Sequence, residues 1–310
     1  MKRILTILIT LLFVVMLAAC GADNPVIENA PVADNTTTAV TENAEVLNED
    51  EKEITDAKDI IFEEIVVVDN DACTIKITGI EEDNIWGYSL KAFFENKTAD
   101  QTLMFSVTSA AINDVMADPF FASEVAPSKK SNETISFMGD DFNSNDIGEF
   151  TDILLNFRVY DSEDWMADPV AECSTHIYPY GEDQAVSYNR ETIEGDTILV
   201  DTDDVTVILT DCDPDTMWGY AANLYIVNKT DTTIMVSADN VSVNGFMIDP
   251  FYGDSVDSGK RAFSAMSWYT SDLEDNGITE VESIELTLRV YDENDWSRSD
   301  FVNEVITITP

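Results

Sequence analysis

Three carboxylates alternate along a short acidic stretch, "DCDPDTMW", at residues 211–218. Asp211, Asp213 and Asp215 offer the hard oxygen ligands that Ca²⁺ prefers. The stretch is not an EF-hand loop, because Thr216 and Ala222 stand where that loop needs Gly and Glu. Calcium sites at the ends of β-sandwiches do not need the EF-hand motif, so a calcium site is one prediction for this stretch. The alternative is a solvated acidic turn.

A nine-residue phrase that ends in tryptophan occurs twice, as "FRVYDSEDW" (157–165) and "LRVYDENDW" (288–296). In all, four tryptophans are duplicated: Trp86, Trp165, Trp218 and Trp296. Aromatic faces stack on sugar rings, so glycan binding is one interpretation of these residues. Indoles at strand ends more often cover a core. We therefore expect Trp165 and Trp296 to be largely buried, as parts of the scaffold.

The phrase belongs to a duplication that covers the chain beyond residue 62. "IWGY" (85–88), "NKT" (96–98) and "MADPF" (116–120) return as "MWGY", "NKT" and "MIDPF" at an offset of 131 or 132 residues. We predict a first domain at 63–181, a polar linker at 182–194 and a second domain at 195–310.

Each copy is predicted to be all-β, because apolar residues recur at every second position. Tyr88, Leu90, Ala92 and Phe94 share one face of the run "WGYSLKAFFEN", and the RVYD phrases continue runs with the same alternation. Seven or eight strands in about 115 residues fit an immunoglobulin-like β-sandwich. The predicted fold is therefore two tandem immunoglobulin-like β-sandwich domains.

Turn residues separate these runs. Asn244-Gly245 predicts a tight hairpin of type I′, and Asn113-Asp114 is the equivalent turn of the first copy. In "SDLEDNG" (271–277), Ser271 is expected to cap a single helical turn that Gly277 ends.

The sequence holds one histidine that could act as the base of a nucleophilic site. His176 is the only histidine, and Thr307 stands at the matching place of the second copy. The chain contains no GxSxG, HExxH, Walker or GxGxxG motif. A Ser or Cys nucleophile would have no base partner except His176. The sequence therefore predicts that the protein is not an enzyme.

Cysteines beyond the N-terminal region number three, Cys73, Cys173 and Cys212, so at least one thiol is free or pairs with another chain. No CxxC motif occurs, which argues against a zinc ribbon or a thioredoxin-type site. A disulfide between Cys73 and Cys173 is one possibility. The other is that these residues serve as small buried hydrophobes.

The N-terminus has the pattern of a bacterial lipoprotein signal. "MKR" precedes an apolar stretch that is too short for a comfortable membrane span, and "LAAC" follows at Leu17–Cys20. We predict a signal peptide at 1–19 and lipidation of Cys20, with an uncleaved signal anchor as the alternative. Gly21 stands where a Gram-negative inner-membrane retention signal has Asp, which favours a Gram-positive cell surface.

The residues that follow are polar and acidic, so 20–62 is predicted to be the lipidated Cys and a flexible tether. The whole chain has a formal net charge of -45, from 61 Asp plus Glu against 16 Lys plus Arg. Such a surface repels nucleic acid, so no nucleic-acid partner is expected. The expected partners are the membrane, through the lipid anchor, and an envelope protein or glycan.

The lipobox, the acidic tether and the phrases "WGY", "NKT", "DPF" and "RVYD…DW" resemble a group of Firmicutes-type surface lipoproteins with tandem copies of this unit. The resemblance covers nearly all of residues 63–310. It implies a location and a fold, and no site residues. The sequence thus predicts an extracytoplasmic, lipid-anchored binding or spacer protein. The alternative is an envelope sensor or a glycan- or calcium-binding subunit of a larger surface system.

Overall fold

Runs of alternating apolar residues form strands with one buried face throughout the structure. The computed structural model describes residues 60–84, 87–137, 145 and 147–310. The signal peptide, Cys20, nearly all of the predicted tether and Trp86 lie outside these residues. Within them the chain is almost entirely β, with one short α-helix and one 3-10 turn. The predicted all-β sandwich fold is confirmed.

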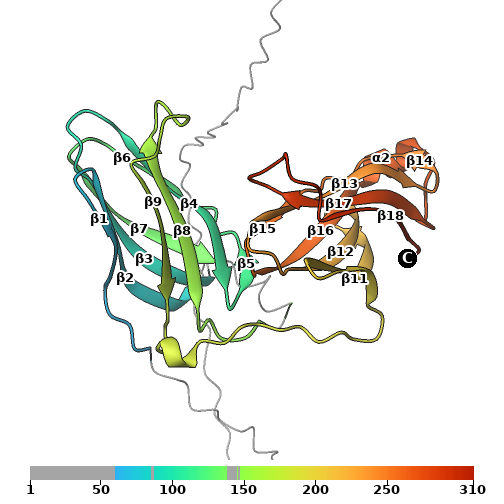
Figure 1. The fold of residues 1–310 in the computed structure, drawn as a ribbon, viewed down its shortest axis with the longest axis horizontal. Coiled ribbons are helices and arrows are strands. Elements are labelled where there is room, and N and C mark those ends of the chain that lie inside the picture. Colours follow the sequence, from blue (N-terminus) through green and yellow to red (C-terminus); the bar gives the residue numbers. More distant parts are fainter. Residues whose placement is uncertain (1–59, 85–86, 138–144, 146) are drawn as a thin grey trace, which may run out of the picture. The chain divides into compact units, whose positions relative to one another are not determined.

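The first half, residues 60–181, forms two layers of strands (Figure 1). One layer has the order β1-β2-β3-β7, and in the other β4, β8 and β9 lie side by side, with β5 and β6 both paired to β4. The strands are β1 (Ile65–Asp69), β2 (Cys73–Asn84), β3 (Gly87–Asn96), β4 (Leu103–Ile112), β5 (Val115–Ala117), β6 (Ala122–Val125), β7 (Lys130–Phe137), β8 (Ile153–Asp161) and β9 (Ala171–Ile177). Their inward faces pack into one hydrophobic core, which includes the predicted residues Leu90, Ala92 and Phe94, together with Leu155 and Phe157 of β8.

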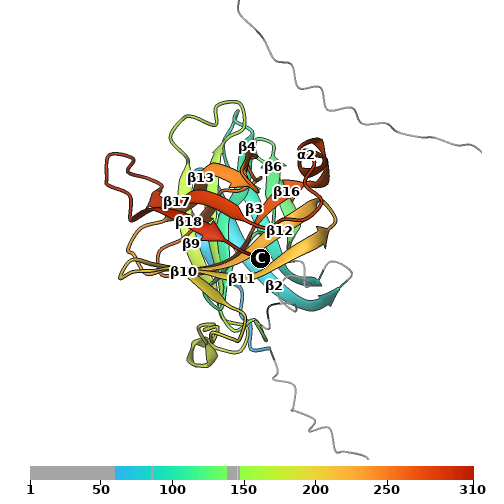
Figure 2. The same cartoon turned by 90° about the vertical axis from the view of Figure 1, so that its right-hand side faces the viewer.

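The second half, residues 195–310, repeats this strand order around a core of its own. One layer is β10-β11-β12-β16, with β10 beside β11 (Figure 2), and the other is β14-β13-β17-β18, with β15 also paired to β13. The elements are β10 (Thr197–Asp201), β11 (Val205–Thr216), β12 (Gly219–Asn228), β13 (Ile234–Val243), β14 (Phe246–Met247), β15 (Asp254–Val256), β16 (Arg261–Tyr269), α2 (Thr270–Asp275), β17 (Ile284–Asp292) and β18 (Val302–Ile308).

The repeated "NKT" phrase ends the third strand of each half with a buried asparagine. The Asn96 amide donates to the carbonyl oxygens of Gln101 and Val125, at 2.8 Å each. The Asn228 amide makes the same bonds to Thr232 and Val256, also at 2.8 Å. Each side-chain oxygen in turn accepts the backbone N–H two residues on. The phrase is repeated because both halves tie the same loop to the same strand.

Both predicted hairpin turns are confirmed. Asn244 (φ 50°) and Gly245 (φ 83°) form a two-residue loop between β13 and β14, and Asn113 (φ 50°) and Asp114 (φ 69°) form the equivalent loop between β4 and β5. The side-chain oxygen of Asn113 also accepts N–H groups of Thr151 and Asp152. The Asn244 oxygen makes the matching pair of bonds. Asparagine therefore supplies both the left-handed backbone and a tie to the next strand.

The predicted helical turn exists, but the prediction of its first residue was wrong. Helix α2 begins at Thr270, its N-cap residue is Tyr269, and no side chain caps it. Ser271 therefore lies inside the helix, and the Thr270 N–H donates to the carbonyl oxygen of Trp218 at 3.2 Å. Gly277 follows the helix with φ 72°, as expected for a residue that ends it.

One short strand pair joins the sheets of the two halves. β5 runs parallel to β16 with Val115 opposite Arg261, which makes a nine-stranded sheet. Beside this pair, Lys260 Nζ lies 2.5 Å from the carboxylate of Asp114. The independence of the two halves, with boundaries at 63–181 and 195–310, stays a prediction.

The predicted polar linker packs more closely than its composition indicates. After a 3-10 turn at Glu182–Gln184, the Tyr188 ring lies edge-on to those of Tyr225 and Phe263, with centroids 6.4 and 5.9 Å away. Arg190 then binds Asp196 through two bonds of 2.7 and 2.8 Å. The segment 182–194 is therefore anchored at both of these points.

Candidate functional site: the repeated Arg-Tyr-Trp cluster

The prediction that Trp165 and Trp296 are buried was wrong. Their side chains are 64% and 82% exposed. Other residues cover this end of each core, namely Val170 and Phe301, whose N–H groups bind back to β8 and β17 at 2.8 and 2.7 Å. The tryptophans are left on the outside of the turn.

The turn that carries each tryptophan is held by an aspartate. Asp161 accepts the Glu163 N–H at 3.0 Å, and Asp292 accepts the N–H groups of Asn294 and Asp295 at 3.0 and 3.2 Å. These bonds from the aspartate close the turn at its backbone. The aspartate of "RVYD" is therefore structural, and the tryptophan of "DW" is free for another role.

An arginine stacked on a tyrosine lies beside each turn. The Arg158 guanidinium is 4.5 Å from the Tyr160 ring centroid, and that of Arg289 is 5.1 Å from Tyr291. Both pairs are on the outward face of the strand, as the alternation predicts. We call Arg158, Tyr160 and Trp165, and the equivalent Arg289, Tyr291 and Trp296, the Arg-Tyr-Trp clusters.

The second cluster is fixed by several polar bonds. Arg289 Nε and Nη2 donate to Asp300 at 2.9 and 3.3 Å, and Nη1 donates to Asp239 at 3.2 Å. The bond from Arg289 holds the pKa of the Asp300 carboxyl below its usual range. Trp296 donates its Nε1–H to the Glu293 carbonyl at 2.9 Å and lies edge-on to Tyr291, with centroids 6.3 Å apart. The indole is thus oriented while most of its surface stays in solvent.

The first cluster is held by different contacts. Arg158 Nη2 donates to the carbonyl oxygen of Trp165 at 2.9 Å, and Nε lies 3.8 Å from Glu172. Arginine, tyrosine and tryptophan are therefore brought together in both halves. Their sequence spacing was visible from the start, but exposure of the indole depends on tertiary packing that the spacing does not contain.

The other tryptophans differ in role. Trp218 is exposed on the turn between β11 and β12. The glycine of its "WGY" phrase is needed, because a Cβ on Gly219 would lie 2.3 Å from the Trp268 carbonyl oxygen. Trp268, which the sequence analysis missed, is 1% exposed and donates to the Ile248 carbonyl at 3.0 Å. Its signal was the alternation of Ala262, Met266 and Trp268 along β16.

The three predicted calcium ligands lie along strand β11 rather than in a loop. Alternate residues of a strand are about 6.6 Å apart, whereas Ca²⁺ ligands lie about 2.4 Å from the ion. Asp211 is bound by the Asn223 amide at 3.1 Å, and Asp213 accepts the Asp215 N–H at 2.9 Å. No group of three or more His, Cys, Asp or Glu side chains suited to a metal occurs among the described residues. The calcium prediction gains no support from this arrangement and stays a prediction.

His176 pairs with a carboxylate, and the three cysteines of the described residues are free thiols. His176 Nδ1 lies 2.7 Å from Asp152, and its ring stacks on Tyr178. Cys73, Cys173 and Cys212 are free thiols, the first buried and the others half-buried. Burial raises the pKa of Cys73 to about 11, which disfavours the reactive thiolate. The thiols fit the interpretation as small hydrophobes better than a disulfide.

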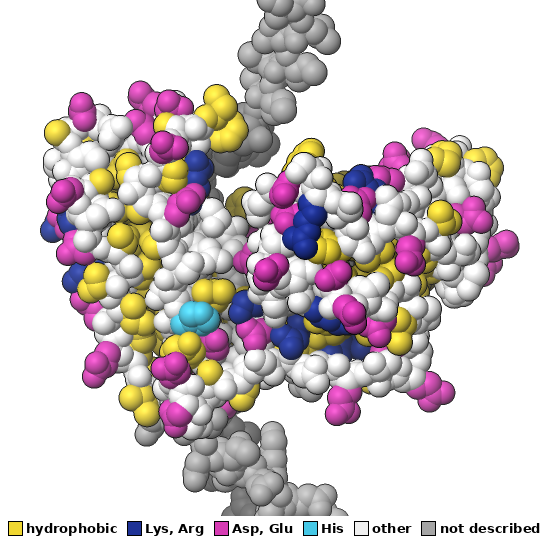
Figure 3. All heavy atoms as spheres, viewed as in Figure 1, with side chains coloured by type: hydrophobic (Ala, Val, Ile, Leu, Met, Phe, Trp, Pro, Cys, Tyr) yellow, Lys and Arg dark blue, Asp and Glu magenta, His cyan; other side chains and the backbone are white. Residues whose placement is uncertain are grey.

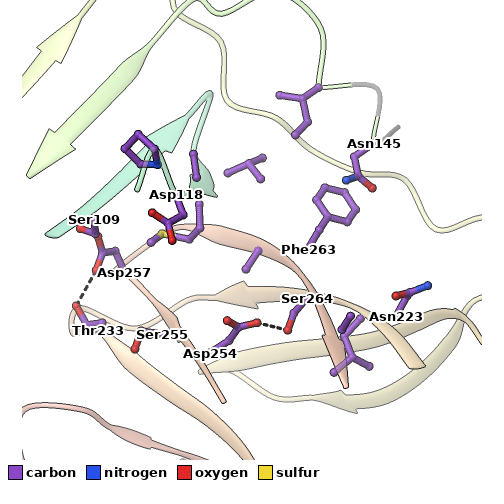
Figure 4. A pocket seen from close by; sticks show the side chains of 18 of the residues that line it. Ser109, Asp118, Asn145, Asn223, Thr233, Asp254, Ser255, Asp257, Phe263 and Ser264 are labelled. Carbon is purple, nitrogen blue, oxygen red and sulfur yellow. Dashed lines mark hydrogen bonds between the residues drawn. The ribbon is translucent and has the colours of Figure 1, made fainter. Parts of the chain in front are cut away.

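An acidic groove of about 1080 Å³ lies where β4 and β5 approach β12, β15 and β16 (Figure 4). Its lining includes five carboxylates and no Lys or Arg: Asp118, Asp211, Asp254, Asp257 and Glu293. Asp257 is bound by Ser109 at 2.7 Å and by Thr233 at 3.1 Å, and Asp254 is bound by Ser264. Hydroxyls of the fold thus bind two of the five carboxylates of the groove.

Acidic side chains are spread over the molecular face drawn in Figure 3, in keeping with the net charge of -45. Among the described residues, no helix is long and apolar enough to cross a membrane.

No protein-family model and no curated protein matches the chain. Among solved structures, an exo-chitosanase of Amycolatopsis orientalis is similar over 74% of this chain, at 10% identity and a TM-score of 0.20. The chain spans 26% of the length of that protein. At this TM-score the likeness carries no conclusion about the activity of this chain.

Proposed function

We propose that the protein is a lipid-anchored extracytoplasmic binding protein whose Arg-Tyr-Trp clusters bind glycans of the cell envelope. The observation that supports this most is the exposure of Trp165 and Trp296 at the same turn of both halves, each beside an arginine stacked on tyrosine. No reaction is part of the proposal.

An exposed indole that both copies retain calls for a role other than packing. Leaving a large aromatic surface in water gives up a burial energy of about 1.5–3 kcal/mol. The apolar face of a sugar ring covers an indole and recovers part of that energy. Around Trp296, Arg289 and Asp300 offer a donor and an acceptor to sugar hydroxyls. The acidic surface does not repel a neutral glycan.

Two clusters in one chain suit a repetitive ligand. A polymer that meets both clusters binds more tightly than either cluster alone, because the second contact is intramolecular. A repeating envelope polysaccharide offers such repeated contacts.

Lipidation of Cys20 would keep the clusters at the envelope. The lipobox "LAAC" motivates this part of the proposal, and two or more acyl chains give stable anchoring. Metabolic labelling with a fatty-acid analogue should mark the wild type and spare Cys20→Ser. Equal labelling of both chains would contradict it.

A protein partner is the second candidate, favoured by another duplicated and exposed aromatic. Phe120 and its equivalent Phe251 are 95% and 77% exposed. Phe120 has a φ of 44°, which is unusual for a bulky residue and marks a backbone held by its surroundings. Two exposed phenylalanines fit an apolar protein contact better than a sugar.

A binding screen separates the two candidates. The full chain would be tested against envelope polysaccharides and envelope proteins, in parallel with Trp165→Ala/Trp296→Ala and Phe120→Ala/Phe251→Ala variants. Glycan binding that the tryptophan variant alone loses supports the proposal. Val305→Ala is the matched control, because Val305 is an exposed apolar residue on β18 outside the clusters. Protein binding that only the phenylalanine variant loses favours the second candidate.

A further inference from the structure

A cavity of about 750 Å³ lies at the end of the second half opposite to its Arg-Tyr-Trp cluster. It is bounded by β11, β12, helix α2 and the segment 278–281. Its apolar wall consists of Leu209, Pro214, Tyr220, Leu273, Ile278 and Val281. A volume of several hundred Å³ with an apolar wall is typical of small-molecule sites.

One buried polar group in this wall has no partner. Tyr220 is 6% exposed, and its hydroxyl makes no hydrogen bond within the described structure. Burial and, to a smaller extent, the nearby Cys212 thiol raise the pKa of Tyr220, but that thiol makes no hydrogen bond of normal geometry with it. An unbonded buried hydroxyl is unfavourable, so a ligand that bonds to it gains affinity.

The charged residues around the cavity determine whether it favours a cationic or an anionic ligand. The lining includes the carboxylates of Asp211, Glu274 and Glu280. It contains no Lys, Arg or His. Cationic groups are attracted to such a lining, and anionic groups are repelled.

In the first half an aromatic side chain packs at the equivalent position. Tyr88 is the equivalent of Tyr220, and its ring lies 4.6 Å from that of Phe150. Phe150 also lies edge-on to Phe137, at 6.3 Å. At the place of Phe150 the second half has Val281, whose smaller side chain lines the cavity. The Tyr88 hydroxyl lacks a partner too, and its ring is partly buried against Phe150.

We propose that this cavity binds a small arylalkylamine. The aromatic body takes the place that Phe150 fills in the first half. A ring N–H of the ligand donates to the Tyr220 hydroxyl, and the ammonium group lies among Asp211, Glu274 and Glu280. This site is separate from the glycan-binding clusters and does not depend on them.

Tryptamine and indole-3-propionate are a matched pair of probes, since they share the indole and differ in the charge of the side chain. Calorimetric titration of the full chain should show tryptamine binding, with the carboxylate at least tenfold weaker. Absence of tryptamine binding, or equal binding of both probes, would overturn the proposal.

Val281→Phe is the central variant, because it gives the second half the residue of the first and leaves the net charge unchanged. Tryptamine binding should fall at least tenfold, while binding that persists would mean only general attraction to an acidic protein. Tyr220→Phe removes the hydroxyl alone and should weaken tryptamine about fivefold. If Val281→Phe fails to fold, Tyr220→Phe decides, and an unchanged affinity then overturns the proposal.

Discussion

The two halves are alike at one end and different at the other. At the end with the "NKT" loops, Asn96 and Asn228 make the same bonds, and the Arg-Tyr-Trp clusters recur. At the opposite end, Phe150 packs against Tyr88 in the first half, whereas the second half has Val281 and a cavity beside Tyr220. The two copies of the duplicated fold are thus alike at one end and differ in the residues that pack at the opposite end.

This difference separates two reasons for a residue to recur. Asn96 and Asn228 recur because the fold needs them, since each is buried and satisfies backbone groups of a loop. Trp165 and Trp296 recur although the fold does not bury them. Stability measurements distinguish the two kinds of residue.

The largest effect is expected at Trp268, the buried tryptophan of β16. Trp268→Ala should lower the free energy of unfolding by about 3–5 kcal/mol, because it empties a packed core position. Denaturant melts of the full chain measure this loss. A loss below about 1 kcal/mol would mean that this end of the second core is already loosely packed.

Asn96→Ala and Asn228→Ala should each cost about 3 kcal/mol. Both changes leave buried carbonyl groups without donors, at about 1–3 kcal/mol for each group. Both halves share two amide bonds, and Asn228 adds only one longer bond, to the Asp257 carbonyl at 3.0 Å, so the two losses should agree within about 1 kcal/mol. Clearly unequal losses would break the comparison, since they would show that one loop tolerates the change.

A smaller effect is expected where the halves meet. Burial raises the pKa of Asp114, but hydrogen bonds from Lys260 and Ser187 outweigh it and leave that pKa below its usual value. A lowered pKa in the folded state means that the carboxylate stabilises above about pH 4 and loses this effect as the pH falls below that value. Asp114→Asn should therefore destabilise by about 1 kcal/mol at pH 7.

Melts of wild type and Asp114→Asn at pH 7 and pH 3 test this sign. The difference between the two chains should shrink as the pH falls. A difference that grows on acidification would show that the Asp114 carboxylate does not stabilise the contact with Lys260.

The smallest effect is expected for Trp165→Ala and Trp296→Ala. Surface substitutions that leave no cavity usually change stability by no more than about 0.5 kcal/mol. Both variants should thus keep the wild-type denaturation midpoint. A shift comparable with that of Trp268→Ala would restore the scaffold interpretation of the repeated phrase.

The sequence predicted those parts of the fold that local chemistry decides. The alternation of Leu90, Ala92 and Phe94 gave the buried face of β3, and Asn-Gly and Asn-Asp gave the hairpin turns. The prediction of burial failed for Trp165 and Trp296. An apolar residue that follows a core strand is buried only if no other side chain already covers that end of the core. Val170 and Phe301 do so here.

The cavity beside Tyr220 also lay beyond the sequence analysis. It depends on the difference between Phe150 and Val281, which the alignment of the repeats contains. Its importance becomes visible only once Tyr88 and Phe150 are seen in contact. The pairing of β5 with β16 has no sequence signal, since a single register pair connects the strands.

The central claim is that the exposed tryptophans of the two clusters bind a ligand. Its most direct test is the affinity of the full chain for the best envelope polysaccharide of the screen, compared with that of Trp165→Ala/Trp296→Ala. The account predicts an affinity at least 100-fold lower for the double variant, with an unchanged denaturation midpoint. Equal affinity of the two chains, or a wild type that binds no envelope polysaccharide, would contradict it.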